Sequence, residues 1–234
     1  MKTILLSLAV LFCSLCSYAS ADVKETVTIE KYGKTFNLTA PDGFCFLSNN
    51  PLFEDILNIV SDQTNRLFDE ETGSGLEHLE FAFLCEELNQ MLDGLPTKDT
   101  LRIHFGMEGL QNFRAQIGSI KKLPSTEEFV SEMWQLFGDE AFHKLIAPYQ
   151  DFIEEEHGIE SVSPIQKIYK GKRCVYTLQG FKRSTLVGSA IAATCWINDR
   201  SVGTYLYKNY SFFESESEIQ GALDILKGFN NSIN

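Results

Sequence analysis

The sequence predicts an α+β fold, in which an antiparallel sheet is flanked by helices. Segments with the alternating pattern of strands lie toward both ends of the chain, and helical patterns lie between them and at the C-terminus. Of the 234 residues, 44% are hydrophobic and 12% aromatic, which is typical of a packed globular protein and not of a disordered one. We therefore expect a single globular domain with its own core.

The first 21 residues have the pattern of a secretory signal peptide. Lys2 supplies the positive charge, residues 4–12 form an apolar run, and residues 19–21 are the small residues of a cleavage site. Cleavage there leaves residues 22–234 as one domain, which we expect in the periplasm or outside the cell.

The beginning of this domain has the signals of a hairpin, a turn and a helix. Apolar and polar residues alternate over residues 27–38, on either side of a turn at Gly33. The Pro-Asp-Gly sequence at residues 41–43 is a second turn, before a short strand over residues 44–47. An Asn-Pro pair then supplies the cap and first position of a helix over residues 50–60.

The middle of the chain combines two strands with two helices. We expect strands over residues 79–85 and 101–107, the second with one buried and one solvated face. A Ser-Thr-Glu-Glu capping box opens a helix over residues 125–137. Another helical pattern follows over residues 142–153, where a proline is expected to kink or divide it.

The C-terminal part predicts three strands and a closing helix. The first strand lies over residues 161–169 or 174–181, and the others lie over residues 186–197 and 202–210, with a hairpin turn between them. A second capping box then begins a helix over residues 215–229, whose apolar residues form one stripe.

The chain is acidic, with a formal net charge of −12, or −13 once the signal peptide with Lys2 is removed. Nucleic acids and anionic membranes bind basic surfaces, so the sequence favours neither as a main partner. Residues 186–197 carry no charge but are too few to cross a bilayer as a helix, so we expect no membrane span in the mature chain.

Four cysteines remain after cleavage: Cys45, Cys85, Cys174 and Cys195. An even number in an exported protein permits two disulfides, in any of three pairings. The pairs Cys45–Cys85 and Cys174–Cys195 are favoured, because each joins strand-like segments that can be neighbours. Buried free thiols explain the same positions equally well. None of the spacings is CxxC, so the cysteines indicate neither a redox site nor a zinc site.

Both ends of the expected domain resemble a known family. Residues 32–44, YGKTFNLTAPDGF, are similar to the start of PsbP/Mog1-like domains, and the long strands through Tyr210 with the helix after them are similar to their end. Residues 79–94 resemble uncharacterised exported bacterial proteins. The resemblance implies an α/β/α sandwich on a six- or seven-stranded, mainly antiparallel sheet, and a binding or assembly role rather than an enzymatic one. The helical insertion over residues 125–157 departs from a minimal domain of this kind.

Two pairs of residues are candidates for chemistry. Glu80 and His104 are expected to face each other on the outer side of neighbouring strands, either as an acid–base pair or as a cross-strand pair on a solvated face. Asp139 and His143, four residues apart, share a helix face as a metal site or as an ordinary surface ion pair. The sequence contains no nucleophile elbow and no phosphate-binding loop, so we expect no cofactor.

These patterns favour a non-enzymatic exported protein that binds a protein partner or a small apolar ligand. The alternative is a secreted hydrolase or metal-dependent enzyme that acts through one of the two residue pairs.

Overall fold

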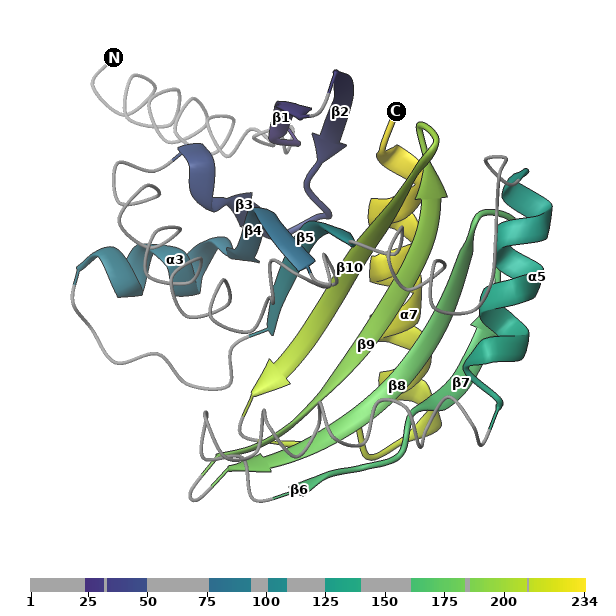
Figure 1. Ribbon diagram of the computed structural model, residues 1–234. Coiled ribbons are helices and arrows are strands. Elements are labelled where there is room, and N and C mark those ends of the chain that lie inside the picture. The colour runs from purple at the N-terminus through teal and green to yellow at the C-terminus, as the bar shows by residue number, and fades with distance from the viewer. Residues whose placement is uncertain are drawn as a thin grey trace, which may run out of the picture.

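A large antiparallel sheet and a separate hairpin form the framework of the protein (Figure 1). The computed structural model describes residues 24–31, 33–49, 76–93, 101–108, 125–139, 161–183, 186–209 and 211–234. The signal peptide over residues 1–21, the helix over residues 50–60 and the helix over residues 142–153 are predictions that lie outside the described residues.

The main sheet has eight strands, and all of its pairings are antiparallel. They are β3 (Phe44–Phe46), β4 (Leu76–Leu84), β5 (Leu101–Glu108), β6 (Ser161–Val162), β7 (Gln166–Lys170), β8 (Cys174–Arg183), β9 (Leu186–Ile197) and β10 (Arg200–Asn209). Seven of them follow the order β3-β4-β5-β10-β9-β8-β6, and β7 pairs with β8 off this path. The sheet-rich α+β fold expected from the sequence is therefore confirmed.

The described helices are η1 (Leu47–Asn49), α3 (Cys85–Leu92), α5 (Thr126–Leu136) and α7 (Glu216–Ser232). Both predicted capping boxes are present, one at the start of α5 and one at the start of α7. The strand predicted over residues 79–85 begins three residues later than β4 and ends one residue later, because α3 begins at Cys85. Glu86 and Glu87 lie in the first turn of α3, where carboxylates favour a helix N-terminus, and this signal was overlooked.

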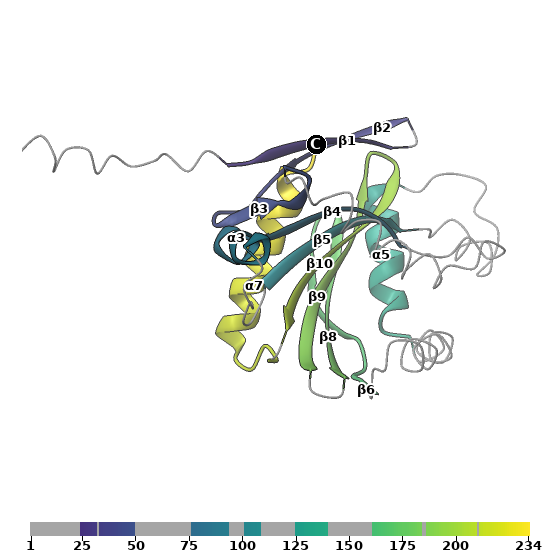
Figure 2. The same cartoon turned by 90° about the vertical axis from the view of Figure 1, so that its left-hand side faces the viewer.

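Two helices pack on opposite faces of the main sheet, as both views show (Figures 1 and 2). On the α7 face, Leu223, Leu226 and Phe229 join the core formed by inward residues of the strands. On the other face, Phe129, Val130 and Met133 of α5 pack on Val175 and Trp196. This alternation along β8 and β9 follows from the period of two in a strand, which sends successive side chains to opposite faces.

A buried polar network joins α7 to the sheet beneath it. The Asn230 side chain accepts a hydrogen bond from Thr204 at 2.9 Å and donates one to the Tyr176 hydroxyl at 3.5 Å. Arg173 donates to the carbonyl oxygens of Asn230 and Ile233, and so satisfies acceptors at the C-terminal end of α7. These bonds fix both the register and the end of the helix.

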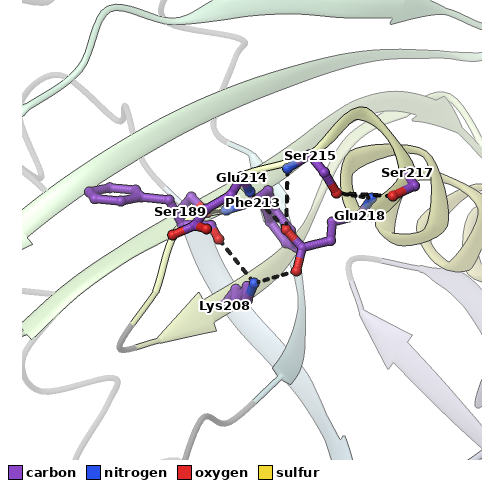
Figure 3. A network of polar contacts seen from close by, with 8 residues as sticks. Ser189, Lys208, Phe213, Glu214, Ser215, Ser217 and Glu218 are labelled. Carbon is purple, nitrogen blue, oxygen red and sulfur yellow. Dashed lines mark hydrogen bonds and ion pairs between the residues drawn. The ribbon is translucent and has the colours of Figure 1, made fainter.

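The N-terminal end of α7 is held by a second polar network (Figure 3). Glu218 accepts hydrogen bonds from the backbone N–H groups of Glu214 and Ser215 and pairs with Lys208 of β10, Nζ to Oε1, at 3.0 Å. These contacts, the Glu214 amide first, lower the pKa of the Glu218 carboxyl. Ser189 of β9 accepts from the Phe213 N–H at 3.0 Å, which ties the segment before α7 to a second strand.

The hairpin predicted near the start of the domain is present as β1 (Thr26–Lys31) and β2 (Lys34–Thr39). Gly33 in its turn has a positive φ of 68°, a conformation that glycine adopts without steric cost. Phe36 and Leu38 of β2 are fully buried in the α7-face core, where Phe36 meets Phe105 edge-on. These two side chains anchor the hairpin to the rest of the protein.

The C-terminal strands agree closely with their predictions. Of the two alternatives for the first strand, residues 174–181 lie in β8, whereas residues 161–169 form two short strands, β6 and β7, in place of one. β9 has the predicted bounds. The turn between β9 and β10 places Asn198 and Asp199 at positive φ, which suits the two-residue turn of a tight hairpin. Within the described residues, no helix has the length and apolar character needed to cross a membrane.

Candidate functional site

Two disulfides are present, in the pairing favoured from the sequence. Cys174 and Cys195 are direct neighbours on β8 and β9 with a Cα–Cα distance of 4.0 Å, and both are buried. Cys45 of β3 and Cys85 at the start of α3 have a Cα–Cα distance of 4.9 Å and are partly exposed. The first pair joins β8 to β9 at the start of β8, and the second fixes the short edge strand β3 to α3.

Two rows of side chains cross β4, β5 and β10 on the face that carries α5. In the first row, Phe81, His104 and Tyr205 are direct cross-strand neighbours. Their rings stack, with centroids 4.7 Å apart for Phe81–His104 and 5.6 Å apart for His104–Tyr205. We call these residues the first aromatic row. The register places Ala192 of β9 beside Tyr205, on the same face as Trp196.

The second aromatic row consists of Phe83, Arg102 and Tyr207, again as direct cross-strand neighbours. The Arg102 guanidinium lies over the Tyr207 ring, 5.1 Å from its centroid. Burial raises the pKa of the Tyr207 hydroxyl, and the nearby Arg102 charge opposes that shift. Both Arg102 and Tyr207 are partly exposed, whereas Phe81, Phe83 and His104 are buried.

Arg102 contacts a ring, and no carboxylate, among the residues that the structure describes. The chain carries 32 acidic and 20 basic residues, and Lys24, Lys34, Lys208 and Lys227 each pair with a carboxylate. Within the part of the chain that the structure describes, Arg102 has no such partner, and its guanidinium contacts the Tyr207 ring. A guanidinium presents a planar fork of donors that matches a carboxylate in two parallel hydrogen bonds. The second row therefore offers a ring and an anion-binding group side by side.

Glu80 is the buried carboxyl of the same region. A β-bulge lies between His78 and Glu80, and there the Glu80 Oε1 accepts from the Phe81 N–H at 2.9 Å and from the Ser48 N–H of η1 at 3.1 Å. Burial raises the pKa of the Glu80 carboxyl, although these hydrogen bonds oppose the shift. The nearby Glu25, whose Oε2 accepts from the Phe46 N–H at 2.8 Å, adds to the increase.

The expectation that Glu80 and His104 face each other on a solvated surface is wrong in its geometry. Glu80 is 1% exposed and pairs in register with Phe105, whereas His104 is 2% exposed and pairs with Phe81. The bulge shifts the register of β4 relative to a regular strand, and the neighbouring rings exclude water from His104. Glu80 is held by backbone amides, and His104 lies between two ring faces.

The second candidate pair is described only in part. Asp139 follows the C-terminal end of α5 and is exposed, whereas His143 lies outside the described residues. Among the residues that the structure describes, no group of three or more His, Cys, Asp or Glu side chains is placed to hold a metal ion.

The aromatic rows were overlooked at the sequence level, although part of their signal is readable. Phe81 and Phe83, Arg102 and His104, and Tyr205 and Tyr207 each occupy alternate positions of a strand, so each pair shares one face. What could not be read is that β10 pairs with β5, a strand that lies far away in the sequence. Only this pairing brings the three pairs, each at positions i and i+2 of its own strand, together into two continuous rows across the sheet.

Neither a protein-family model nor a curated protein nor a solved structure matches the chain.

Proposed function

We propose that this chain is a non-enzymatic, exported binding or accessory protein, and that its ligand occupies the Arg102–Tyr207 end of the second aromatic row. The single observation that carries the proposal is the partly exposed Arg102, which lies over a tyrosine ring and pairs with no described carboxylate. The ligand that fits is a small apolar molecule, or an extended segment of a protein partner, that carries a carboxylate.

The chemistry of the two side chains complements such a ligand. The Tyr207 ring presents a flat apolar surface, which packs against apolar or aromatic groups. The Arg102 guanidinium supplies charge-assisted hydrogen bonds, which give orientation as well as affinity. Ala190, the register neighbour of Tyr207 on β9, is small and leaves the ring without a bulky neighbour on that strand.

The sheet beneath this surface supports a preformed site. Arg102 and Tyr207 are direct neighbours in the ladder between β5 and β10, in the interior of the sheet order. The backbone of a residue on a paired central strand is already fixed, whereas that of a loop residue is not. Binding at such a residue therefore costs little conformational entropy.

Export is supported by two independent features. The first 21 residues have the signal-peptide pattern, and both disulfides are of a kind that forms in oxidising compartments. The packing of α5 and α7 on opposite sheet faces also supports an α/β/α sandwich like that of PsbP/Mog1-like domains, which we retain as a proposal.

The enzymatic alternative rests on the raised pKa of Glu80, because catalytic carboxyls are often perturbed in this direction. In its favour, a buried carboxyl with a raised pKa can act as a general acid near neutral pH. Against it, the Oε1 atom accepts two backbone N–H groups, and the side chain is almost fully buried. The contacts therefore favour a structural role for Glu80 and a binding function for the protein.

Native mass spectrometry of the protein from the exported fraction of its own host tests the proposal. We expect a chain with the mass of residues 22–234, with both disulfides formed and with an additional bound mass. The variant Arg102→Gln should lose this mass, since it removes the guanidinium and keeps a polar side chain. Lys167→Gln is the matched control, because Lys167 also lies over a ring, that of Trp134, 4.9 Å from its centroid.

The outcomes separate the parts of the proposal. A chain that retains residues 1–21 contradicts export by cleavage, and a bare mature chain contradicts a tightly bound ligand. Bound mass that survives Arg102→Gln contradicts the position of the site. A variant Tyr207→Ala that loses the mass as well would place the ligand against the ring.

A further inference from the structure

The hairpin formed by β1 and β2 has two outer edges, and their backbone groups are satisfied very differently. In an antiparallel pair, alternate residues of each strand direct their N–H and C=O groups toward the partner strand or away from it. The residues that point away form the outer edge. On β2 these are Thr35, Asn37 and Thr39, and on β1 they are the register partners Glu30, Thr28 and Thr26.

This assignment follows from two backbone contacts. The Asn37 N–H donates to Asn234 O at 3.1 Å, and the Asn234 N–H donates to Asn37 O at 3.3 Å, so both groups of Asn37 point away from β1. The Ala40 N–H donates to Glu25 O at 2.9 Å, so residue 25 points toward β2. By alternation, Thr26, Thr28 and Glu30 point outward.

The outer edge of β2 is occupied along its length. The Asn198 side chain donates to Thr35 O at 2.9 Å, and the Ser232 hydroxyl donates to Thr39 O at 3.3 Å. Between them, Asn234 pairs with Asn37 through both backbone groups. The last residues of the chain therefore cover this edge.

The outer edge of β1 has no such cover. Thr26, Thr28 and Glu30 are exposed, and their outward backbone groups have no hydrogen-bond partner in the described parts of the chain. Residues 26–29, Thr-Val-Thr-Ile, are all β-branched, β1 contains no proline, and no bulge interrupts the β1–β2 pairing, so Glu30 at the end of the edge is its one charged outward residue. Exposed edges in monomeric proteins are usually protected by one of these devices.

We propose that the outer edge of β1 pairs with the same edge of a second copy of this chain, antiparallel and with the two-fold axis at Thr28. This dimer would join two hairpins into one sheet with the order β2-β1-β1-β2. The proposal is independent of the ligand site at Arg102 and Tyr207, since it uses a different sheet and different residues.

The sequence of β1 is self-complementary in this register. Val27 meets Ile29 of the second copy, and Glu25 meets the oppositely charged Lys31 of the second copy, so no like charges face each other. Outward residues must face outward residues, and on β1 these are the even-numbered ones. The nearest alternative registers therefore shift one copy by two residues along the other, so that Thr28 faces residue 26 or residue 30 of the second copy. Those registers place Ile29 opposite Glu25 or Val27 opposite Lys31, which opposes an apolar residue to a charged one.

Repulsion between the net negative charges of the two copies opposes the dimer, and it should make dimerisation depend on salt concentration. Each mature copy carries a net charge of −13, the −12 of the whole chain less Lys2. Salt screens this repulsion between copies and leaves short-range backbone hydrogen bonds in place. We therefore expect the dimer to tighten as the salt concentration rises.

Analytical ultracentrifugation of residues 22–234 over a concentration series tests the proposal. We expect a monomer–dimer equilibrium that Thr28→Pro abolishes, because proline lacks the outward N–H and is tolerated where that group faces solvent. Thr28→Ala is the matched control and should still dimerise, since it also loses the hydroxyl but keeps the N–H. A wild-type chain that stays monomeric throughout, or an undiminished Thr28→Pro dimer, overturns the proposal.

A cross-linking experiment keeps the test decisive even when Thr28→Pro fails to fold. Residues paired across the two-fold axis have a Cα–Cα distance of about 5.5 Å, which a disulfide can bridge. Thr28→Cys should therefore form a covalent dimer under mild oxidation, whereas Glu30→Cys, which faces Thr26 of the second copy, should not. Equal cross-linking of the two variants, or none of either, contradicts the register.

Discussion

The two faces of the main sheet are built on different principles. On the α7 face, large apolar side chains such as Phe229 and Leu226 are almost wholly buried, and the polar groups of Asn230 and Thr204 satisfy each other. On the α5 face, the second aromatic row places the partly exposed Arg102 and Tyr207 beside buried rings. The α7 face is therefore a packed interior, whereas the α5 face combines buried side chains with partly exposed ones.

This difference indicates where the protein can tolerate change. A close-packed core responds to any lost volume, because its neighbours cannot fill a cavity completely. A partly exposed row already contacts solvent, so a lost ring there leaves a smaller cavity. We therefore expect stability to depend chiefly on the α7 face and ligand binding on the α5 face.

The largest expected effect is that of Phe229→Ala. Phe229 is 1% exposed and contacts the rings of Phe46 and Phe105, with centroids 6.4 Å and 6.3 Å away. Removal of such a buried ring lowers the free energy of unfolding by about 3–5 kcal/mol. Tyr205→Ala on the other face should cost markedly less, because Tyr205 is partly exposed. Chemical denaturation of both variants measures this contrast, and equal losses would refute it.

A smaller loss is expected for Asn230→Ala, which leaves the hydroxyls of Thr204 and Tyr176 without their Asn230 contacts. A buried polar group that loses its partner costs about 1–3 kcal/mol. The second substitution Thr204→Val removes one of these hydroxyls, so the double variant should be more stable than additivity predicts. A double-mutant cycle by urea denaturation gives the coupling, and strict additivity would show that the two side chains do not act together.

The smallest effect is expected at Glu80, and its size depends on pH. The pKa of Glu80 is raised in the folded state, so its stabilising contribution is complete below the unfolded pKa and is lost as pH rises through the folded value. Glu80→Gln removes this titration. As pH rises from the unfolded pKa of Glu80 through its folded pKa, the free energy of unfolding of the variant should therefore increase relative to that of the wild type.

Glu218→Gln is the control for this prediction, because the pKa of Glu218 is lowered. Its contribution is present above the unfolded pKa and is lost as pH falls through the folded value, so the difference from wild type has the opposite dependence on pH. Unfolding free energies of both variants over a pH series give the two slopes. Slopes of the same sign would contradict the environments assigned to these carboxyls.

Local signals in the sequence predicted the elements that local chemistry controls. The capping boxes at Ser125 and Ser215 are present because a serine and a glutamate three residues later satisfy each other's backbone groups. The hairpin turns at Gly33 and Asn198 follow from residues that tolerate positive φ. By contrast, the bulge before Glu80 has no comparable local signature, and it altered the geometry of the predicted Glu80–His104 pair.

The sequence by itself determined the α+β class and the bounds of β9, because both depend on the periodicity of neighbouring residues. It favoured the cysteine pairs, which are 40 and 21 residues apart, but left free thiols equally possible. The tertiary structure alone decided that β10 lies between β5 and β9. That pairing places Arg102 over Tyr207 and buries His104 between Phe81 and Tyr205. Strand order is set by packing between distant segments, and the pattern within a single strand does not record which neighbour it will have.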